Sequence, residues 1–275
     1  MPVSDALARS TVRLHCEDGN RSSVGTSFLY RIGEGEVWTP LLVTNRHVVE
    51  GFSVAHLSFS RATDLREAGP ENSENVTVNN LQNLVVYHPN ADIDLAAVLL
   101  GPIVNQLAAN NTPINLTAIR EGDLVDDDVE RRIRFVEDVL VVGYPQGLWD
   151  EHRNLPLFRS GVTASSPVLD YNNEPKFLID CSIYPGSSGS PVFLYNSGVI
   201  LDARDNSASF GERVKLLGVV YAVQLYQANG HVTETTPANA RAMANIGIPS
   251  NLGVVVKARE ILTLVNEVRR LSGGN

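Results

Sequence analysis

Short runs of β-branched and apolar residues recur along most of the chain, and Gly, Pro, Asn or Asp interrupts them at short intervals. Such runs between turn residues are typical of β-strands. The expected strands are residues 10–16, 24–32, 37–44, 53–59, 84–87, 95–100, 139–142, 177–179, 190–195, 216–223 and 252–256. So many short strands favour a sandwich or barrels, and the pattern therefore predicts an all-β protein.

One segment at the end of the chain predicts a longer helix. Residues 258–271 place apolar side chains roughly on one face at helical spacing. These side chains are Ile261, Leu262, Leu264, Val265 and Val268. Arg269 and Arg270 stand in the last turn, where positive charge is favourable. A single helical turn is also expected around residues 47–51.

The middle of the chain, residues 105–136, indicates a connector between two β halves. It contains an Asn-Asn-Thr-Pro stretch at 110–113 and three aspartates at 126–128. Three carboxylates in a row can bind Ca²⁺, but a solvated loop is the more common outcome of such a charge run. We expect a first β-barrel in residues 1–115, a linker in 116–135, a second β-barrel in 136–257, and a helix with a tail in 258–275.

Charge and composition exclude several classes of partner. The chain has 22 Lys and Arg against 31 Asp and Glu, a net charge of −9, which argues against binding nucleic acid phosphates. No stretch approaches the roughly 20 apolar residues of a membrane span, and the N-terminus lacks a signal-peptide pattern. A cytoplasmic protein is expected. Cys16 and Cys181 are then expected as free buried thiols, with one long-range disulfide as the alternative.

A glycine-rich loop carries the chain's most informative chemistry. Ser188 stands in Pro-Gly-Ser-Ser-Gly-Ser-Pro, residues 185–191, with glycines at 186 and 189. Such glycines permit unusual backbone angles, so the loop can present a hydroxyl and aim N–H groups of Gly186 and Ser188 at a developing oxyanion. Taken alone, a loop of this composition is more often only a turn.

Two other segments supply what a serine nucleophile needs. A serine hydroxyl requires a base, and that base requires an acceptor that orients it. His47 follows an apolar strand at a turn, and Asp92 and Asp94 precede another apolar run. The other histidines show no pair at metal-ligand spacing, and no phosphate-binding loop is present, so neither metal nor cofactor is expected.

Three segments, in their order along the chain, resemble the trypsin-like, chymotrypsin-fold serine peptidases, and most closely their bacterial HtrA/DegP-like branch. They are Thr-Asn-Arg-His-Val-Val, Asp-Leu-Ala and Pro-Gly-Ser-Ser-Gly-Ser-Pro. Segments 24–28, 141–147, 159–162 and 218–222 are similar to further strands of the family. The resemblance spans nearly residues 10–257. It implies two six-stranded antiparallel β-barrels, followed here by the C-terminal helix.

The resemblance also implies a role for each matching residue. Ser188 would be the nucleophile, His47 the general base, and Asp94 the acid that orients His47, while Asp92 stays open as the alternative acid. The oxyanion hole would be the N–H groups of Gly186 and Ser188. The substrate-binding residues would be Ser182 at the base of the P1 pocket, with Val220, Tyr221, Ala222 and Val223 as wall and pairing strand.

Two departures from the family matter. Ser187 stands where digestive relatives have an aspartate, so activation by a new N-terminal amine lacks its acceptor. HtrA proteins carry PDZ domains after the peptidase, and none is expected here. No carboxylate stands at the pocket base, which predicts a small or medium apolar P1 residue.

The expected function is therefore a serine endopeptidase that acts on extended or unfolded protein segments, which add as a strand to a sheet edge. An activating ligand or partner protein is a further expectation, since an intracellular protease must be restrained. The rival interpretation is a catalytically silent relative that serves as a binding or scaffold module. An esterase or other acyl hydrolase would use the same three residues, although their order is wrong for an α/β-hydrolase.

Overall fold

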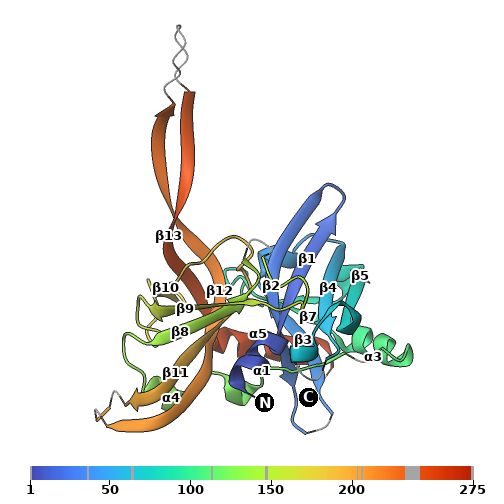
Figure 1. Ribbon diagram of the computed structural model, residues 1–275, viewed down its shortest axis with the longest axis horizontal. Helices are drawn as coiled ribbons and strands as arrows, with labels where there is room; N and C mark the ends of the chain where they lie inside the picture. The colour runs from blue at the N-terminus through green and yellow to red at the C-terminus, as the bar shows by residue number, and fades with distance from the viewer. Residues whose placement is uncertain are drawn as a thin grey trace.

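Two antiparallel β-structures, one from each half of the chain, make up most of the molecule, as Figure 1 shows. The computed structural model describes residues 2–273 except 36, 63–64, 113, 146–147, 203, 206 and 233–241. For residues 223–232 and 242–250 it describes the backbone only. The predicted all-β fold with a C-terminal helix is confirmed. Of the predicted strand segment 141–147, Gln146 and Gly147 lie outside the described residues.

The first half forms a sheet of seven strands, one more than predicted. The strands are β1 (Thr11–Asp18), β2 (Arg21–Ile32), β3 (Thr39–Thr44), β4 (Val54–Ser60), β5 (Ser73–Asn79), β6 (Val85–Tyr87) and β7 (Ala96–Leu99). Their order in the sheet is β5-β4-β1-β2-β3-β7-β6. The strand that the sequence did not predict is β5, an edge strand of mostly polar residues, in which little apolar alternation marks a buried face.

The second half forms a closed barrel of six strands, as predicted. They are β8 (Asp138–Gly143), β9 (Leu157–Thr163), β10 (Lys176–Asp180), β11 (Pro191–Leu201), β12 (Ala208–Val232) and β13 (Ala242–Lys257), in the order β10-β13-β12-β11-β8-β9. The last three strands are longer than predicted. Beyond the barrel, β12 and β13 continue as a two-stranded ribbon that rises far from the rest of the molecule (Figure 1).

The helices are short, and they lie near the chain ends, between the halves and, for α2 and three of the 3-10 turns, between strands of the first half. They are α1 (Val3–Ser10), α2 (Arg46–Val49), α3 (Gly101–Ala109), α4 (Asp127–Glu130) and α5 (Arg259–Leu271), with 3-10 turns η1 (Leu65–Glu67), η2 (Pro70–Asn72), η3 (Leu81–Asn83) and η4 (Glu121–Asp123). The prediction of α5 is confirmed. The sequence analysis missed α1, α3 and the single turn α4, which forms where a solvated loop was expected at 126–128. Helix α3 begins at a Gly-Pro pair that resembles a turn, although Pro is well suited to a first helical turn. Asp126 caps α4 by accepting a hydrogen bond from the Val129 amide at 2.9 Å.

The largest hydrophobic cluster joins the two halves. It buries Phe28 and Tyr30 from the first sheet, Val142 and Phe193 from the barrel, and Leu264 from α5. Helix α5 therefore stabilises the packing of one half on the other. Separate clusters fill the first sheet and the barrel.

Both cysteines are free and buried, as predicted, with Cys16 in the first sheet and Cys181 at the end of β10. Burial raises the pKa of the Cys16 thiol to about 12, and burial also raises that of Cys181. Thiols of this kind are poor nucleophiles. Among the described helices, none is long and apolar enough to cross a membrane.

Candidate active site

His47 stands in the single turn α2, at the end of a buried strand. The turn is anchored by Val48 and Val49, which are both buried, while the His47 side chain is half exposed. Asn45, just before α2, makes no helix-capping hydrogen bond and instead donates from Nδ2 to the Asp94 carbonyl oxygen at 2.7 Å. The accessible imidazole thus stands on a turn that buried side chains anchor, and Asn45 connects that turn to the segment that carries Asp94.

Asp94 contacts His47 at two points. Its Oδ1 accepts the His47 backbone N–H at 2.9 Å, and its Oδ2 lies 2.5 Å from His47 Nδ1. A carboxylate can only accept, so Nδ1 carries a hydrogen, and in the neutral imidazole Nε2 keeps its lone pair. The Asp94 side chain is largely buried, which shields the contact from water. The imidazole is therefore oriented with its basic nitrogen away from the carboxylate.

Asp92, the alternative acid, lies in a different environment. Its residue is exposed, and its backbone N–H donates to Asn90 Oδ1 at 3.0 Å. In a regular strand, Asp92 and Asp94 would point to the same side, because they are two residues apart. Strand β7 begins only at Ala96, so both aspartates precede it and this rule does not apply to them. Among the described contacts, Asp94 is the aspartate that meets His47.

Ser188 lies in the loop of residues 181–190, here called the serine loop, between β10 and β11. Gly186 and Gly189 adopt φ angles of +87° and +86°, a region that favours glycine. Two tight turns flank Ser188, because the Ser187 amide donates to the Tyr184 carbonyl and the Ser190 amide to the Ser187 carbonyl, each at 3.0 Å. Ser187 is buried within these turns. Local turns of the chain thus hold the loop around Ser188.

Thr26 of β2 connects the serine loop to the first sheet. Its amide donates to the Ser188 carbonyl at 2.8 Å, and its Oγ1 donates to the Gly186 carbonyl at 3.1 Å. Its own carbonyl accepts from Thr44 Oγ1 at 2.7 Å, and Thr44 ends the strand that leads to His47. Thr26 is fully buried. One residue therefore joins the serine loop to the strand that presents the imidazole.

Close packing of glycines brings the same segments together. A side chain at Gly189 would overlap the Thr26 carbonyl, and one at Gly25 would lie 2.7 Å from Val48 Cγ1 and 3.2 Å from the Ser188 carbonyl oxygen. Val48 directly follows His47. The turn that carries His47 and the loop that carries Ser188 are thus adjacent across Gly25.

The two predicted oxyanion donors are unpaired in the part of the chain that the structure describes. The amides of Gly186 and Ser188 donate to no described residue, whereas those of their neighbours Ser187 and Gly189 do. The Gly189 amide donates to the Val220 carbonyl at 2.9 Å. Two free N–H groups beside a hydroxyl are the chemical requirement for stabilising a tetrahedral oxyanion.

The predicted substrate-pairing strand begins next to the serine loop. Val220 exchanges two hydrogen bonds with the loop, since it donates to Ser190 and accepts from Gly189, each at 2.9 Å. The Val220 side chain is buried in the barrel, while Tyr221 and Ala222 are partly exposed. The Val223 side chain lies outside the described residues. The Lys176 ammonium lies 4.8 Å from the centroid of the Tyr221 ring.

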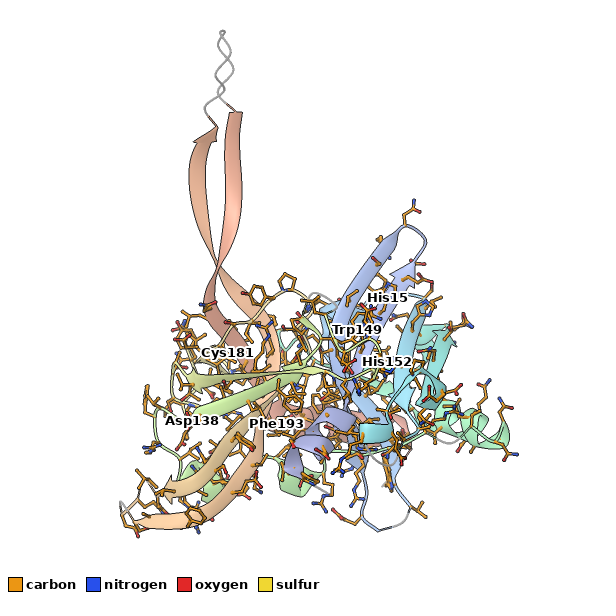
Figure 2. All side chains as sticks on the ribbon, viewed as in Figure 1. His15, Asp138, Trp149, His152, Cys181 and Phe193 are labelled. Atoms are coloured by element: carbon orange, nitrogen blue, oxygen red, sulfur yellow. The ribbon has the colours of Figure 1, made fainter. Side chains whose placement is uncertain are left out.

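Ser182, predicted at the pocket base, is exposed between two buried residues, Cys181 and Ile183; Cys181 is labelled in Figure 2. Its carbonyl accepts a hydrogen bond from Arg159 Nη1 at 2.9 Å, and the Arg159 guanidinium lies 4.9 Å from the Tyr184 ring centroid. The charged group in contact with Ser182 is therefore a cation, which the sequence analysis did not identify.

Sequence reasoning also missed Asn45 and Thr26. Both lie inside segments that carried the resemblance, 44–49 and 24–28, but a motif does not say which of its residues bonds to a distant loop. Each acts on a segment far along the chain, Asn45 on Asp94 and Thr26 on Ser188.

Comparisons with known proteins agree with the fold. The sequence model described as the trypsin-like peptidase domain matches residues 25–201. No curated protein sequence matches this chain. A thermostable serine protease from an extremophilic microorganism is similar in structure, with a TM-score of 0.52 and 11% identity over 96% of this chain and 98% of that chain.

Two other solved structures match more loosely. The protease Anisep from Arthrobacter nicotinovorans has a TM-score of 0.48 and 14% identity over 91% of this chain and 90% of that chain. An inactivated protease paralogue from the scabies mite has a TM-score of 0.46 and 16% identity over 95% of each chain.

Proposed function

Because the chain belongs to the trypsin-like peptidase domain family, we propose that it is a serine endopeptidase in which Ser188 attacks the scissile carbonyl. The two-point contact of Asp94 with His47 is the observation that carries this proposal. A binding module has no need of an imidazole held in one tautomer beside a serine loop. A nucleophilic serine requires it.

The reaction would proceed through an acyl-enzyme. His47 Nε2 takes the Ser188 hydroxyl proton as Oγ bonds to the carbonyl carbon, and the N–H groups of Gly186 and Ser188 stabilise the oxyanion. Protonated His47 then gives this proton to the leaving amine as the peptide bond breaks. Water, deprotonated by His47, releases the acyl group and restores the Ser188 hydroxyl.

The substrate would be an extended or unfolded segment with a small or medium apolar P1 residue. The absence of a carboxylate contact at Ser182, among the described residues, supports this choice over Arg or Lys. A library of peptides that differ only at P1 tests it. Preference for Arg or Lys would contradict the apolar assignment, and preference for Glu or Asp would instead assign P1 recognition to Arg159.

A fluorophosphonate probe tests the nucleophile directly. Intact mass and peptide mapping should show one label on Ser188 in the wild type and none in Ser188→Ala. Well-folded protein that is never labelled, with or without added candidate activators, would support a silent scaffold. Restored labelling on adding a ligand or partner protein would support regulation through ordering of the serine loop.

Cleavage of an unfolded protein such as reduced casein distinguishes an endopeptidase from another acyl hydrolase. For a disulfide-bonded globular protein, we expect internal cleavage of the reduced and alkylated, unfolded chain and little cleavage of the native, folded form. Hydrolysis of simple esters with no peptide cleavage would favour the acyl-hydrolase alternative.

A further inference from the structure

One edge of β12 runs unpaired from the serine loop along the whole projecting ribbon. Strand β11 pairs with β12 only as far as Val219, which lies opposite Pro191. The serine loop then takes up Val220 through two hydrogen bonds. From Tyr221 to Val232, β12 pairs only with β13 among the residues that the structure describes, and its opposite edge has no partner strand. The ribbon of residues 225–232 and 242–249 is here called the arm.

A strand edge that stays unpaired over this length is unusual in folded proteins. An unpaired strand edge exposes N–H and C=O groups that readily template another strand, and natural edges are usually short, bulged or covered. Here the open stretch is twelve residues long, about 40 Å at the usual strand rise of about 3.3 Å per residue. Two register shifts, at 220–222 and 223–225, lie at its base, where Figure 1 shows the ribbon turning out of the barrel.

We propose that the β12 edge of the arm binds the part of the substrate that precedes the scissile bond, as an added antiparallel strand. This inference rests on the proposed peptidase function and extends its substrate class. The preferred substrate is then a segment with about ten extended residues before the cleaved bond, longer than a pocket beside Ser188 would require.

The direction of the chain supports this occupant. Strand β12 leaves the serine loop at Val220 and runs away from it toward Val232. An antiparallel strand on this edge would run back from Val232 toward Val220, so its N-terminal part lies along the arm. Its C-terminal end then arrives beside Ser188, where the acyl group must form.

Continuity favours substrate over a second copy of the chain. The arm continues the same strand as the residues that contact the serine loop, with two register shifts between them, so a strand seated on the arm leads to the site. The other free edge, on β13, leads to β10 at Leu252–Asp180 rather than to Ser188. Two-stranded ribbons twist strongly, and an added third strand follows that twist.

Peptides of graded length test the proposal. A fixed cleavage sequence is extended on its N-terminal side to 3, 6, 9 and 12 residues with a Thr-Val repeat, and KM and kcat are measured. We expect KM to fall by about tenfold or more between 3 and 12 residues, with kcat unchanged, since each backbone hydrogen bond adds a modest net gain. A KM that does not change with length overturns the inference.

Affinity for the same peptides in Ser188→Ala, measured by fluorescence anisotropy, separates this inference from the proposed function. Affinity that rises with length in a protein whose wild type never cleaves peptides would support the arm and contradict the peptidase. Cleavage by the wild type, together with an affinity that does not depend on peptide length, would support the peptidase and contradict the role of the arm.

A shortened variant then assigns the effect to the arm. Tyr226 pairs with Ile248, so residues 227–247 can be replaced by an Asn-Gly turn, which suits a two-residue hairpin. We expect this variant to lose the length dependence. The matched control shortens the other long hairpin by replacing residues 199–210, between the paired Gly198 and Gly211, with the same Asn-Gly turn, and it should keep that dependence.

Methylation of single backbone amides in the 12-residue peptide tests strand addition itself. Alternate N–H groups of an edge-bound strand face its partner, so KM should rise at every second position. Equal effects at all positions, or a change of oligomeric state on shortening the arm with the length dependence intact, would contradict the proposal.

Discussion

The contact between Asp94 and His47 requires a carboxylate at position 94. Both carboxylate oxygens are used, one on the imidazole and one on the backbone N–H of the same residue. An amide in place of the carboxylate would present a donor where an acceptor is required, and so would favour the wrong imidazole tautomer.

We therefore expect Asp94→Asn to lower kcat by about 10³- to 10⁴-fold with little change in the unfolding midpoint. Steady-state kinetics with a short peptide substrate measures the effect. Asp92→Asn is the matched control, because its exposed carboxylate lies only two residues away, and it should remain near wild type. The reverse result would make Asp92 the acid.

Thr26 should act as a positioning residue for the serine loop. Its Oγ1 donates to the Gly186 carbonyl and accepts from the Tyr144 amide at 3.0 Å. Thr26→Val keeps the shape and removes both bonds, so we expect about a tenfold loss of kcat and a loss of about 1–3 kcal/mol in the free energy of unfolding. Thr26→Ser should recover kcat, which a purely steric role for the residue would not predict.

At this scale the sequence pointed to candidate reactive groups, whose roles stay predictions, but not to the residues that support them. Ser188, His47 and Asp94 stand in short motifs whose chemistry is legible from residue type. Thr26 and Asn45 support them through bonds to segments distant in sequence, and nothing local in a Thr or an Asn predicts such a partner.

Among the elements, α5 links the two halves through polar contacts as well as apolar packing. The imidazole of His88, just after β6, is nearly fully buried, and its Nε2 lies 3.3 Å from Glu260 Oε2 of α5. Among the described residues Nε2 makes no hydrogen bond of good geometry, so the contact with Glu260 is a close approach between polar groups. The His88 amide donates to the Leu95 carbonyl, next to Asp94.

Glu260→Ala should therefore lower the free energy of unfolding by about 1–3 kcal/mol, since it removes the carboxylate beside buried His88 and the 3.4 Å contact of that carboxylate with Arg259 Nε. Urea unfolding measures the change. Glu267→Ala is the control on the same helix, where the carboxylate pairs with exposed Arg270, and it should cost less than about 1 kcal/mol. Equal costs would mean that the His88 contact adds nothing.

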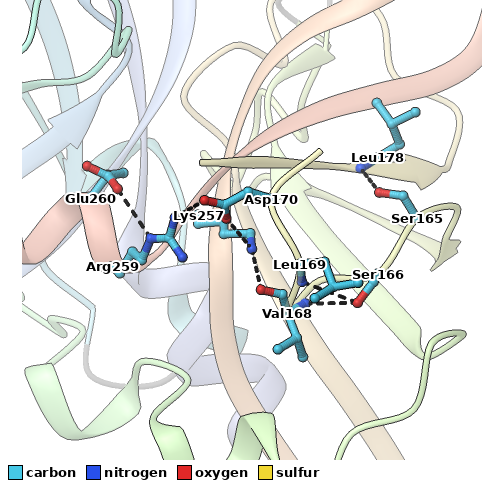
Figure 3. Close-up of polar contacts among 9 residues, drawn as sticks. All are labelled: Ser165, Ser166, Val168, Leu169, Asp170, Leu178, Lys257, Arg259 and Glu260. Carbon is cyan, nitrogen blue, oxygen red and sulfur yellow. Dashed lines mark hydrogen bonds and ion pairs between the residues drawn. The ribbon is translucent and has the colours of Figure 1, made fainter. Parts of the chain in front are cut away.

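The start of α5 is also held by Asp170. Figure 3 shows the Asp170 carboxylate between Lys257 and Arg259, with Lys257 Nζ also donating to the Val168 carbonyl at 2.6 Å. Burial works to raise the pKa of Asp170, but hydrogen bonds from Lys257 and Arg259 outweigh it and hold that pKa below its usual range.

A carboxyl group with a lowered pKa stabilises the fold above its unfolded-state pKa, about 3.9, and this stability is lost as pH falls through the folded-state pKa. The Asp170 side chain is 36% exposed, so water screens its ion pairs and Asp170→Asn should cost only about 1 kcal/mol at pH 7. The difference from wild type should shrink below about pH 4. Urea titrations at several pH values test this. Asp18→Asn, whose partner Arg21 is exposed, should show a much smaller difference, and an Asp170 effect that persists at pH 2 would contradict the assignment.

Element prediction succeeded where a buried face repeats over a whole strand or over several helical turns, and failed for the short helices α1 and α3, which bury only a few residues each, and for β5. Most strands of both halves and α5 carry such a face. Strand β5 is a polar edge, and the arm continues beyond the barrel, where burial no longer constrains its residues. A local pattern cannot show how far a strand extends once it leaves the core.

In the whole molecule, the site belongs to neither half. The first sheet carries His47 and Asp94, the second barrel carries Ser188, and Gly25 and Thr26 of β2 contact both. Activity should therefore depend on how the halves pack together. We expect the urea midpoint for loss of peptidase activity to lie below the midpoint for loss of the far-ultraviolet circular dichroism signal. Coincident midpoints would mean that the halves separate only as they unfold.

The connector between β7 and β8 takes no part in these contacts with the serine loop, so the site needs the two halves but not the covalent link between them. A chain cut in that segment would leave two pieces, each with its own hydrophobic cluster and each chemically inert toward peptides. If the two pieces were fused to two proteins that associate only under some condition, cleavage of a peptide substrate would report that association. The proposed peptidase would then work as a two-part sensor.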